Sequence, residues 1–108
     1  MPVADHIRKE IVQLILRTHP ETKEAPEIVR RYVRYGASPR GAQALELAAK
    51  VHALLSDRYH VAAEDVRAVV LPSLRHRIVR NFEAIAEGIE SDAILAEAIA
   101  EVSGSSNA

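Results

Sequence analysis

The amino-acid sequence predicts an all-α fold, a small bundle of four to five helices in a single domain. Ala, Leu, Val, Ile, Arg and Glu dominate the chain, which is a composition typical of helical proteins. Apolar residues recur at helical spacing in several segments. Strand signals are nearly absent, because the only β-branched cluster, at Val66, Val69 and Val70, lies among Ala, Glu and Arg.

Length, charge and composition exclude several classes of function. The 108 residues suit one domain, and 48% apolar with 27% charged residues allow a buried core. The absence of cysteine excludes disulfides, zinc–thiolate sites, cysteine nucleophiles and iron–sulfur clusters. A net charge of -1 gives no support to nucleic-acid binding, and no apolar run approaches the ~20 residues of a membrane span. The chain starts without a signal-peptide pattern, so we expect a cytoplasmic protein.

Two helices are predicted in the first third of the chain. The first covers Asp5 to Arg17, where apolar residues share one helix face, and Pro20 lies in a polar loop over residues 18–25. The second, shorter helix covers Pro26 to Tyr35, with proline in its first turn. Gly36 is placed to end this helix as its C′ residue.

The third helix is the most apolar, and we expect it at the centre of the core. Ser38 and Pro39 supply an N-cap and an N1 proline, so the helix is predicted from Pro39 to about Ser56. Its wide apolar stripe consists of Ala44, Leu45, Leu47, Ala48, Val51, Leu54 and Leu55. This pattern predicts that Leu47 and Leu54 are buried, so that truncating either to alanine costs about 2–5 kcal/mol.

The remaining segments are shorter. A fourth helix begins near Ala63, directs Val66, Val69 and Val70 inward and ends between Leu71 and His76. Residues 75–80 read as an extended basic connector, and residues 82–87 as a short turn or helix. A last helix is predicted over 92–102, capped by Ser91, so that residues 1–102 form the domain and 103–108 a flexible tail.

Charge is segregated near the end of the chain. Residues 66–82 contain arginines and no acid, whereas residues 83–102 contain acids and no base. In one interpretation the acidic segment folds back onto the basic connector. In the other, a charged patch faces a partner subunit or domain. The candidate interface residues are then Arg75, His76, Arg77 and Arg80.

We find no self-sufficient catalytic constellation. The four glycines fit no nucleotide-binding loop, and Ser38 lies in no Gly-x-Ser-x-Gly elbow. None of the five histidines is three or four residues from another, so no local metal pair is present. We therefore assign no catalytic residue and no metal ligand.

Arg40 is the one local irregularity. It lies in the first turn of the third predicted helix, where a cation meets the positive end of the helix dipole and no carboxylate offsets it. Such a position makes sense where an anion binds, because a helix N-terminus and an arginine both favour phosphate, and Gly41 leaves room for close approach. Alternatively, the arginine extends into solvent or pairs with a distant glutamate.

The string Tyr-Gly-Ala-Ser-Pro-Arg-Gly at residues 35–41 and the Ala-Leu-rich run after it resemble the C-terminal lid domain of MoxR-type AAA+ ATPases. Further matches keep the order, namely Arg58-Tyr59, Glu64-Asp65-Val66 and Leu74-Arg75-His76-Arg77. The resemblance covers about residues 5–88. Ala62 and Ala63 depart from it, because the family usually has a Thr or Ser cap followed by Pro.

The resemblance implies a role in ATP hydrolysis by a larger protein. The family's lid packs beside the nucleotide cleft of a preceding AAA+ α/β domain, and its sensor 2 arginine, which corresponds to Arg40, reaches the γ-phosphate. Ser38, Pro39 and Gly41 complete the expected nucleotide-binding set. The Walker motifs, sensor 1 and arginine finger belong to the α/β domain, so ATP and Mg²⁺ are expected only in the parent protein, which is an ATP hydrolase.

The same resemblance implies partners. We expect the chain to be one piece of a longer, chaperone-like ATPase, with Met1 added, or alternatively a stand-alone remnant. Neighbouring subunits of a ring are expected to contact it, and von Willebrand A-type proteins are possible partners of the family.

The sequence also suggests two other functions. A helix-turn-helix DNA-binding domain could be built from residues 26–35 and 39–56, but the second helix is too apolar to read DNA. A helical adaptor could bind a protein through the arginine-rich connector or the last helix, and this role is compatible with a lid.

Overall fold

The computed structural model describes residues 3–106, which form six helices and one two-stranded sheet. This confirms the predicted small helical fold, with one helix more than the four to five expected. The elements in chain order are α1 (Asp5–Arg17), α2 (Glu27–Tyr32), β1 (Val33–Tyr35), α3 (Pro39–Leu55), α4 (Ala63–Leu74), β2 (Val79–Arg80), α5 (Phe82–Glu87) and α6 (Ser91–Ser106).

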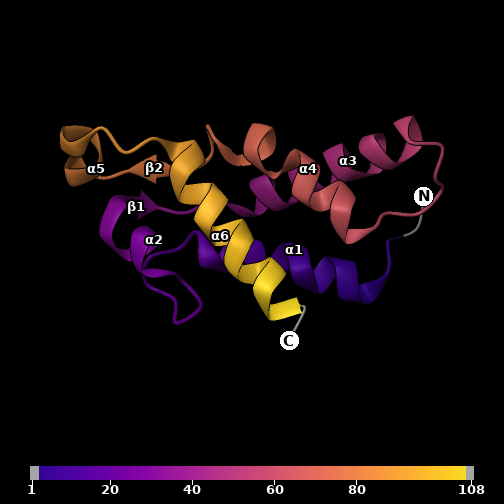
Figure 1. Cartoon of the computed structure of the whole chain (residues 1–108), viewed down its shortest axis with the longest axis horizontal. Coiled ribbons are helices and arrows are strands. Elements are labelled where there is room, and N and C mark those ends of the chain that lie inside the picture. The colour runs from indigo at the N-terminus through magenta and orange to yellow at the C-terminus, as the bar shows by residue number, and fades with distance from the viewer. Residues whose placement is uncertain (1–2, 107–108) are drawn as a thin grey trace.

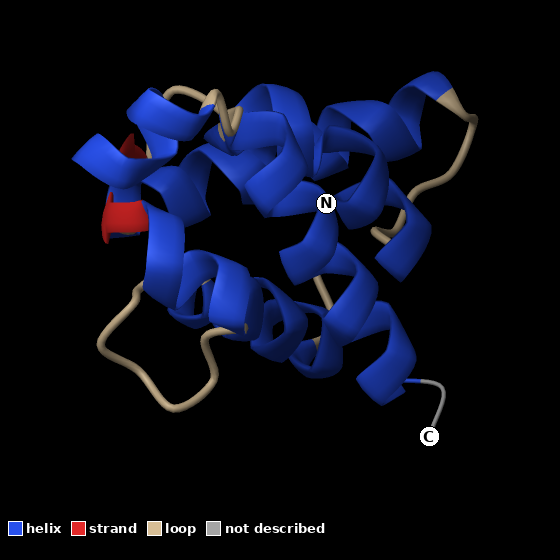
Figure 2. Cartoon of the chain, turned by 60° about the vertical axis from the view of Figure 1, so that its left-hand side comes forward, coloured by secondary structure: helices blue, strands red, loops and turns tan. Residues whose placement is uncertain are grey.

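The helices pack as a bundle that extends 43 × 27 × 20 Å. Helices α3 and α4 lie side by side along the long axis, and α6 crosses α1 and also contacts α4 (Figure 1). The small sheet, α2 and α5 gather at one end, and the loop between α3 and α4 lies at the other (Figures 1 and 2). The largest fully buried apolar side chains are those of Val29, Leu45, Val66, Val70, Leu74, Ile94 and Leu95. No helix among the described residues is both long and apolar enough to span a bilayer.

The second helix is shorter than predicted. It ends at Tyr32, and the next three residues form β1, which pairs antiparallel with β2 through Val33 opposite Arg80 and Tyr35 opposite Val79. A helix this short is marginal by itself, so pairing with a distant strand outweighs local helix propensity. Gly36 therefore follows a strand instead of ending a helix, and the basic connector contributes a turn followed by β2.

The space between α2 and α3 is occupied by β1, not by a tight turn between two packed helices. These two helices consequently do not form the helix-turn-helix unit of the alternative DNA-binding function. At the other end of the chain, α6 continues to Ser106, past the predicted end at Val102. The helix thus covers residues 103–106, which were expected to be tail, while residues 107–108 lie outside the described residues.

Helix α3 buries a different face from the one predicted. Its buried residues are Gly41, Leu45, Ala49 and Ala53, whereas Leu47 is 64% exposed and Leu54 is 52% exposed. Small residues face inward because α4 approaches closely: a Cβ added to Gly41 would lie 3.4 Å from Leu74 Cδ2. The expectation that Leu47 and Leu54 are core residues is therefore wrong, and α3 presents an apolar face to its surroundings.

This arrangement gives a stability prediction. Replacing the fully buried Leu45 with alanine is expected to lower the free energy of unfolding by about 3 kcal/mol, because the change removes buried area and leaves a cavity. Replacing the exposed Leu47 is expected to cost less than about 1 kcal/mol. Urea unfolding of the two variants checks this, and equal midpoints would mean that α3 is rotated from the position described.

Candidate functional site

The N-terminus of α3 presents Arg40 on the surface. Ser38 occupies the N-cap position with extended backbone, but its side chain makes no capping hydrogen bond, and Pro39 at N1 has no N–H. The first turn contains no acidic residue, as the sequence predicted. A cation and a weakly capped helix end therefore coincide, an arrangement that favours a bound anion.

The charged side chains around Arg40 leave its guanidinium available to bind an anion. Glu46, the next acid along the chain, accepts a hydrogen bond from Arg8 Nε at 3.1 Å. Among the described residues, no hydrogen bond or ion pair involves the Arg40 side chain. Of the two alternatives to an anion contact, pairing with a distant glutamate is thus not observed, and the Arg40 side chain is exposed to solvent.

The other residues of the predicted nucleotide-binding set differ in exposure. Ser38 and Pro39 are exposed beside Arg40, whereas Gly41 is buried. Because Gly41 has no side chain, Ala37 and Arg77 can pack closely against it. An added Cβ would lie 3.1 Å from Ala37 Cβ and 3.6 Å from Arg77 Cδ. The last contact brings Arg77, an exposed residue, to the first turn of α3.

In the basic connector, residues 75–80, some side chains pair within the domain and others are exposed to solvent. Arg75 donates two hydrogen bonds to the carboxylate of Asp92, at 3.0 and 2.9 Å. Arg80 Nη1 donates to the carbonyl of Ile89 at 2.9 Å. His76 and Arg77 are exposed. Of the two interpretations of the charge segregation, the internal one therefore describes Arg75, and two of the four candidate interface residues remain on the surface.

The exposed apolar residues of α3 lie on the same side of the helix as Arg40. Residues seven and eleven positions after Arg40 return to the same side of a helix, so Leu47 and Val51 lie on its side, with Leu54 close by. Val51 is 49% exposed and Leu54 52% exposed. The anion-favouring helix end and the apolar face thus form one continuous surface, which we call the α3 face and define as Arg40, Leu47, Val51 and Leu54.

Two residues in the loop that follows α1 hold the segment before Arg40 in place. Thr18 Oγ1 accepts a hydrogen bond from the backbone N–H of Ala37 at 2.9 Å, and His19 Nε2 donates to the Ala37 carbonyl at 2.7 Å. No local pattern marked these contacts, because Thr18 and His19 are about twenty residues away from Ala37 in the sequence.

A second unforeseen cluster lies at the far end of α3. Asp65 is fully buried, and its carboxylate accepts two 2.7 Å hydrogen bonds from Arg58, one of 2.6 Å from His52 Nδ1 and one of 2.7 Å from the Ala62 N–H. Burial alone would raise the pKa of Asp65, but these donors outweigh it and lower the pKa from 3.8 to about 2. The Asp65 carboxylate thereby caps the backbone N–H of Ala62, the N-cap residue of α4, whose own side chain has no acceptor.

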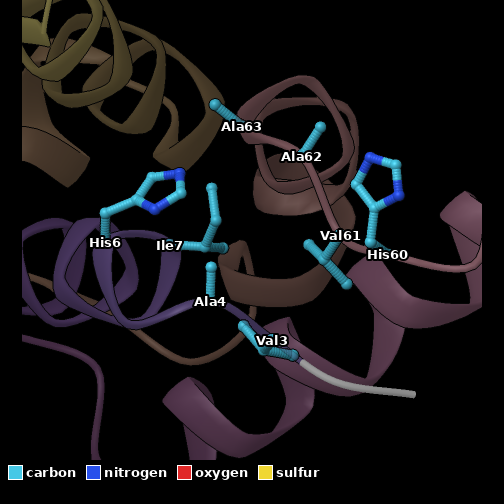
Figure 3. A pocket seen from close by; sticks show the side chains of 8 residues that line it. All are labelled: Val3, Ala4, His6, Ile7, His60, Val61, Ala62 and Ala63. Atoms are coloured by element: carbon cyan, nitrogen blue, oxygen red, sulfur yellow. The ribbon is translucent and has the colours of Figure 1, made fainter.

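An apolar pocket of about 480 Å³ lies at the end of α3 opposite Arg40. Figure 3 shows His6 and His60 on its two sides, with Val3, Ile7 and Val61 between them. Among the described residues, no three His, Cys, Asp or Glu side chains gather in the arrangement of metal ligands.

Comparison with known proteins identifies the family of this helical domain. The AAA lid domain family matches residues 25–98, which include all of α2 to α5 and most of the core. The chain belongs to the AAA lid domain family. The resemblance that the string at residues 35–41 indicated is thus confirmed.

The lid domain is similar to segments of longer proteins. It is 35% identical over 100 residues to YeaC of Bacillus subtilis, covering 91% of this chain and 28% of YeaC. It is 31% identical over 85 residues to Chaperone MoxR1 of Mycobacterium tuberculosis, covering 79% of this chain and 22% of that protein. A crystal structure of a candidate ATPase from Cytophaga hutchinsonii matches with a TM-score of 0.84 and 34% identity, over 90% of this chain and 29% of the other. The lid domain is therefore of the MoxR type, and it spans less than a third of each of these proteins.

Proposed function

We propose that this lid domain closes over the nucleotide cleft of an AAA+ α/β domain in a longer ATPase, with Arg40 as the sensor 2 residue that contacts the γ-phosphate of ATP. The observation that carries the proposal is the state of Arg40: exposed, without an internal partner, at a helix end that carries no acid. The membership in the AAA lid domain family supports it.

The chemistry of this contact follows from charge. A guanidinium offers several N–H donors in a planar fork, which suits the oxygens of a phosphoryl group. As the γ-phosphoryl group transfers, its negative charge is spread over those oxygens, so a nearby cation lowers the energy of the transition state. Arg40 supplies that cation, the α3 N-terminus adds its partial positive charge, and ATP and Mg²⁺ are held mainly by the α/β domain.

The remainder of the α3 face gives the α/β domain a surface to cover. Exposed leucine and valine side chains on one helix face gain free energy when a partner removes them from water. Because Arg40 is on the same face, a domain that packs on Leu47 and Val51 also brings its nucleotide toward Arg40. The proposal extends to the assembled protein. Neighbouring subunits of a ring contact the lid domain, and the longer ATPase remodels partner proteins in the manner of a chaperone, with von Willebrand A-type proteins as candidate partners.

A charge placed on the α3 face tests the proposed function. Leu47→Asp is expected to lower the steady-state ATPase rate of the longer ATPase by about tenfold or more, because an unpaired carboxylate in an apolar interface is costly. The isolated lid domain is expected to remain folded, since Leu47 is 64% exposed.

The matched control is Ile85→Asp, which introduces the same charge at a side chain that is 60% exposed on α5, at the opposite end of the molecule from the loop between α3 and α4 (Figure 1). This variant is expected to keep the wild-type ATPase rate. An unchanged rate in Leu47→Asp would show that the α3 face does not pack against the nucleotide-binding domain.

A further inference from the structure

The backbone of Ala37 is held on both sides by the end of α1. Its N–H donates to Thr18 Oγ1 at 2.9 Å, and its carbonyl accepts from His19 Nε2 at 2.7 Å. Ala37 is fully buried, and it lies three residues before Arg40. Because both backbone hydrogen-bonding groups of this residue are occupied, Ala37 cannot shift without breaking contacts to Thr18 or His19.

Thr18 is itself fixed. It is only 2% exposed, and its hydroxyl donates to the carbonyl of Ile15 at 2.6 Å while accepting from Ala37. A hydroxyl has one hydrogen to donate, so both contacts define a single orientation. The Thr18 side chain therefore ties the last turn of α1 directly to the segment that carries Arg40.

The chain also approaches closely at Gly36. A Cβ added to this glycine would lie 2.6 Å from the carbonyl oxygen of Thr18 and 2.7 Å from the ring of His19. Only glycine lets the backbone pass at this distance. The hydrogen bonds at Ala37 and the contact at Gly36 together leave little freedom for the start of α3.

We propose that Thr18 is a positioning residue for Arg40, assisted by His19, and that it makes α1 and the α3 N-terminus move as one unit against the nucleotide. This inference rests on the proposed function, because positioning matters only if Arg40 contacts the γ-phosphate. Transition-state contacts are sensitive to displacements of about 1 Å, so loosening Ala37 weakens the Arg40 contact without removing the arginine.

A double-mutant cycle in the longer ATPase tests the inference. Thr18→Val removes the hydroxyl while preserving the shape of the side chain, and it is expected to lower kcat about tenfold when Arg40 is present. In an Arg40→Ala background the same change is expected to lower kcat less than about twofold, because the residue that Thr18 positions is absent. Thr18→Ser, which keeps the hydroxyl, is expected to retain most of the activity.

Thr22→Val is the matched control, because the single hydroxyl hydrogen of Thr22 is shared between the carbonyl oxygens of Leu16 at 2.7 Å and His19 at 2.9 Å, and among the described residues Thr22 makes no hydrogen bond to Ala37. It is expected to leave kcat within about twofold of wild type. Equal losses from Thr18→Val in both backgrounds, or none in either, would overturn the positioning role. If Arg40→Ala alone leaves kcat unchanged, the proposed function itself fails, so the two failures are distinguishable.

Discussion

Replacing Asp65 with alanine is expected to lower the free energy of unfolding of the lid domain by about 3–5 kcal/mol. The carboxylate is fully buried and holds Arg58, His52 and the N–H of Ala62 together. Its removal takes away the buried partner of the Arg58 guanidinium, which keeps only the exposed carboxylate of Glu64, and opens the junction between α3 and α4. Urea unfolding at neutral pH measures the loss.

The matched control for Asp65 is its neighbour Glu64. The Glu64 side chain is 67% exposed and lies 3.5 Å from Arg58 Nη1, so it forms a solvent-exposed ion pair with the same arginine. Glu64→Ala is expected to cost less than about 1 kcal/mol, as is typical of surface ion pairs. Similar losses in the two variants would contradict the structural role that we assign to the buried carboxylate.

The pH dependence of stability checks the same carboxylate. The pKa of Asp65 is lowered from 3.8 to about 2 in the folded state, so its contribution is fully present above about pH 4 and is lost as the pH falls toward 2. The difference corresponds to about 2 kcal/mol. In Asp65→Asn this component of the acid destabilisation is expected to be absent, while that of the other carboxylates remains.

Local sequence signals sufficed to predict the long helices but not their packing. The apolar spacing from Ile7 to Leu14 and the Ser38-Pro39 start placed α1 and α3 correctly. The same spacing could not show which side of α3 is buried, because this helix carries apolar residues on two faces. Packing chose the face of small residues, where Ala49 and Ala53 allow α4 to approach.

Long-range pairings were also beyond local reasoning. The strand at residues 33–35 exists because residues 79–80 pair with it from more than forty positions away. The Asp65 network similarly draws on His52, which lies thirteen residues earlier on another helix. The anion-favouring position of Arg40, by contrast, depends only on its place in a helix start, and the sequence therefore predicted that local arrangement.

Under the proposed function, Arg40→Ala is expected to lower the kcat of the longer ATPase by about 10²-fold, because the charge on the transferring γ-phosphoryl group would lose one of its counter-charges. ATP affinity is expected to fall less than kcat, because the contact strengthens in the transition state. Arg40→Lys is expected to recover only part of the rate, since it keeps the charge but loses the planar fork.

The stability of the lid domain distinguishes this role from a structural one. Arg40 is exposed, so the melting temperature of Arg40→Ala is expected to equal that of the wild type or to rise slightly, as a cation leaves the positive end of α3. Arg67→Ala, which removes an exposed arginine from α4, is the control and is expected to leave kcat unchanged. A wild-type rate in Arg40→Ala would show that Arg40 is not a nucleotide sensor, and a large fall in melting temperature would show that its role is structural.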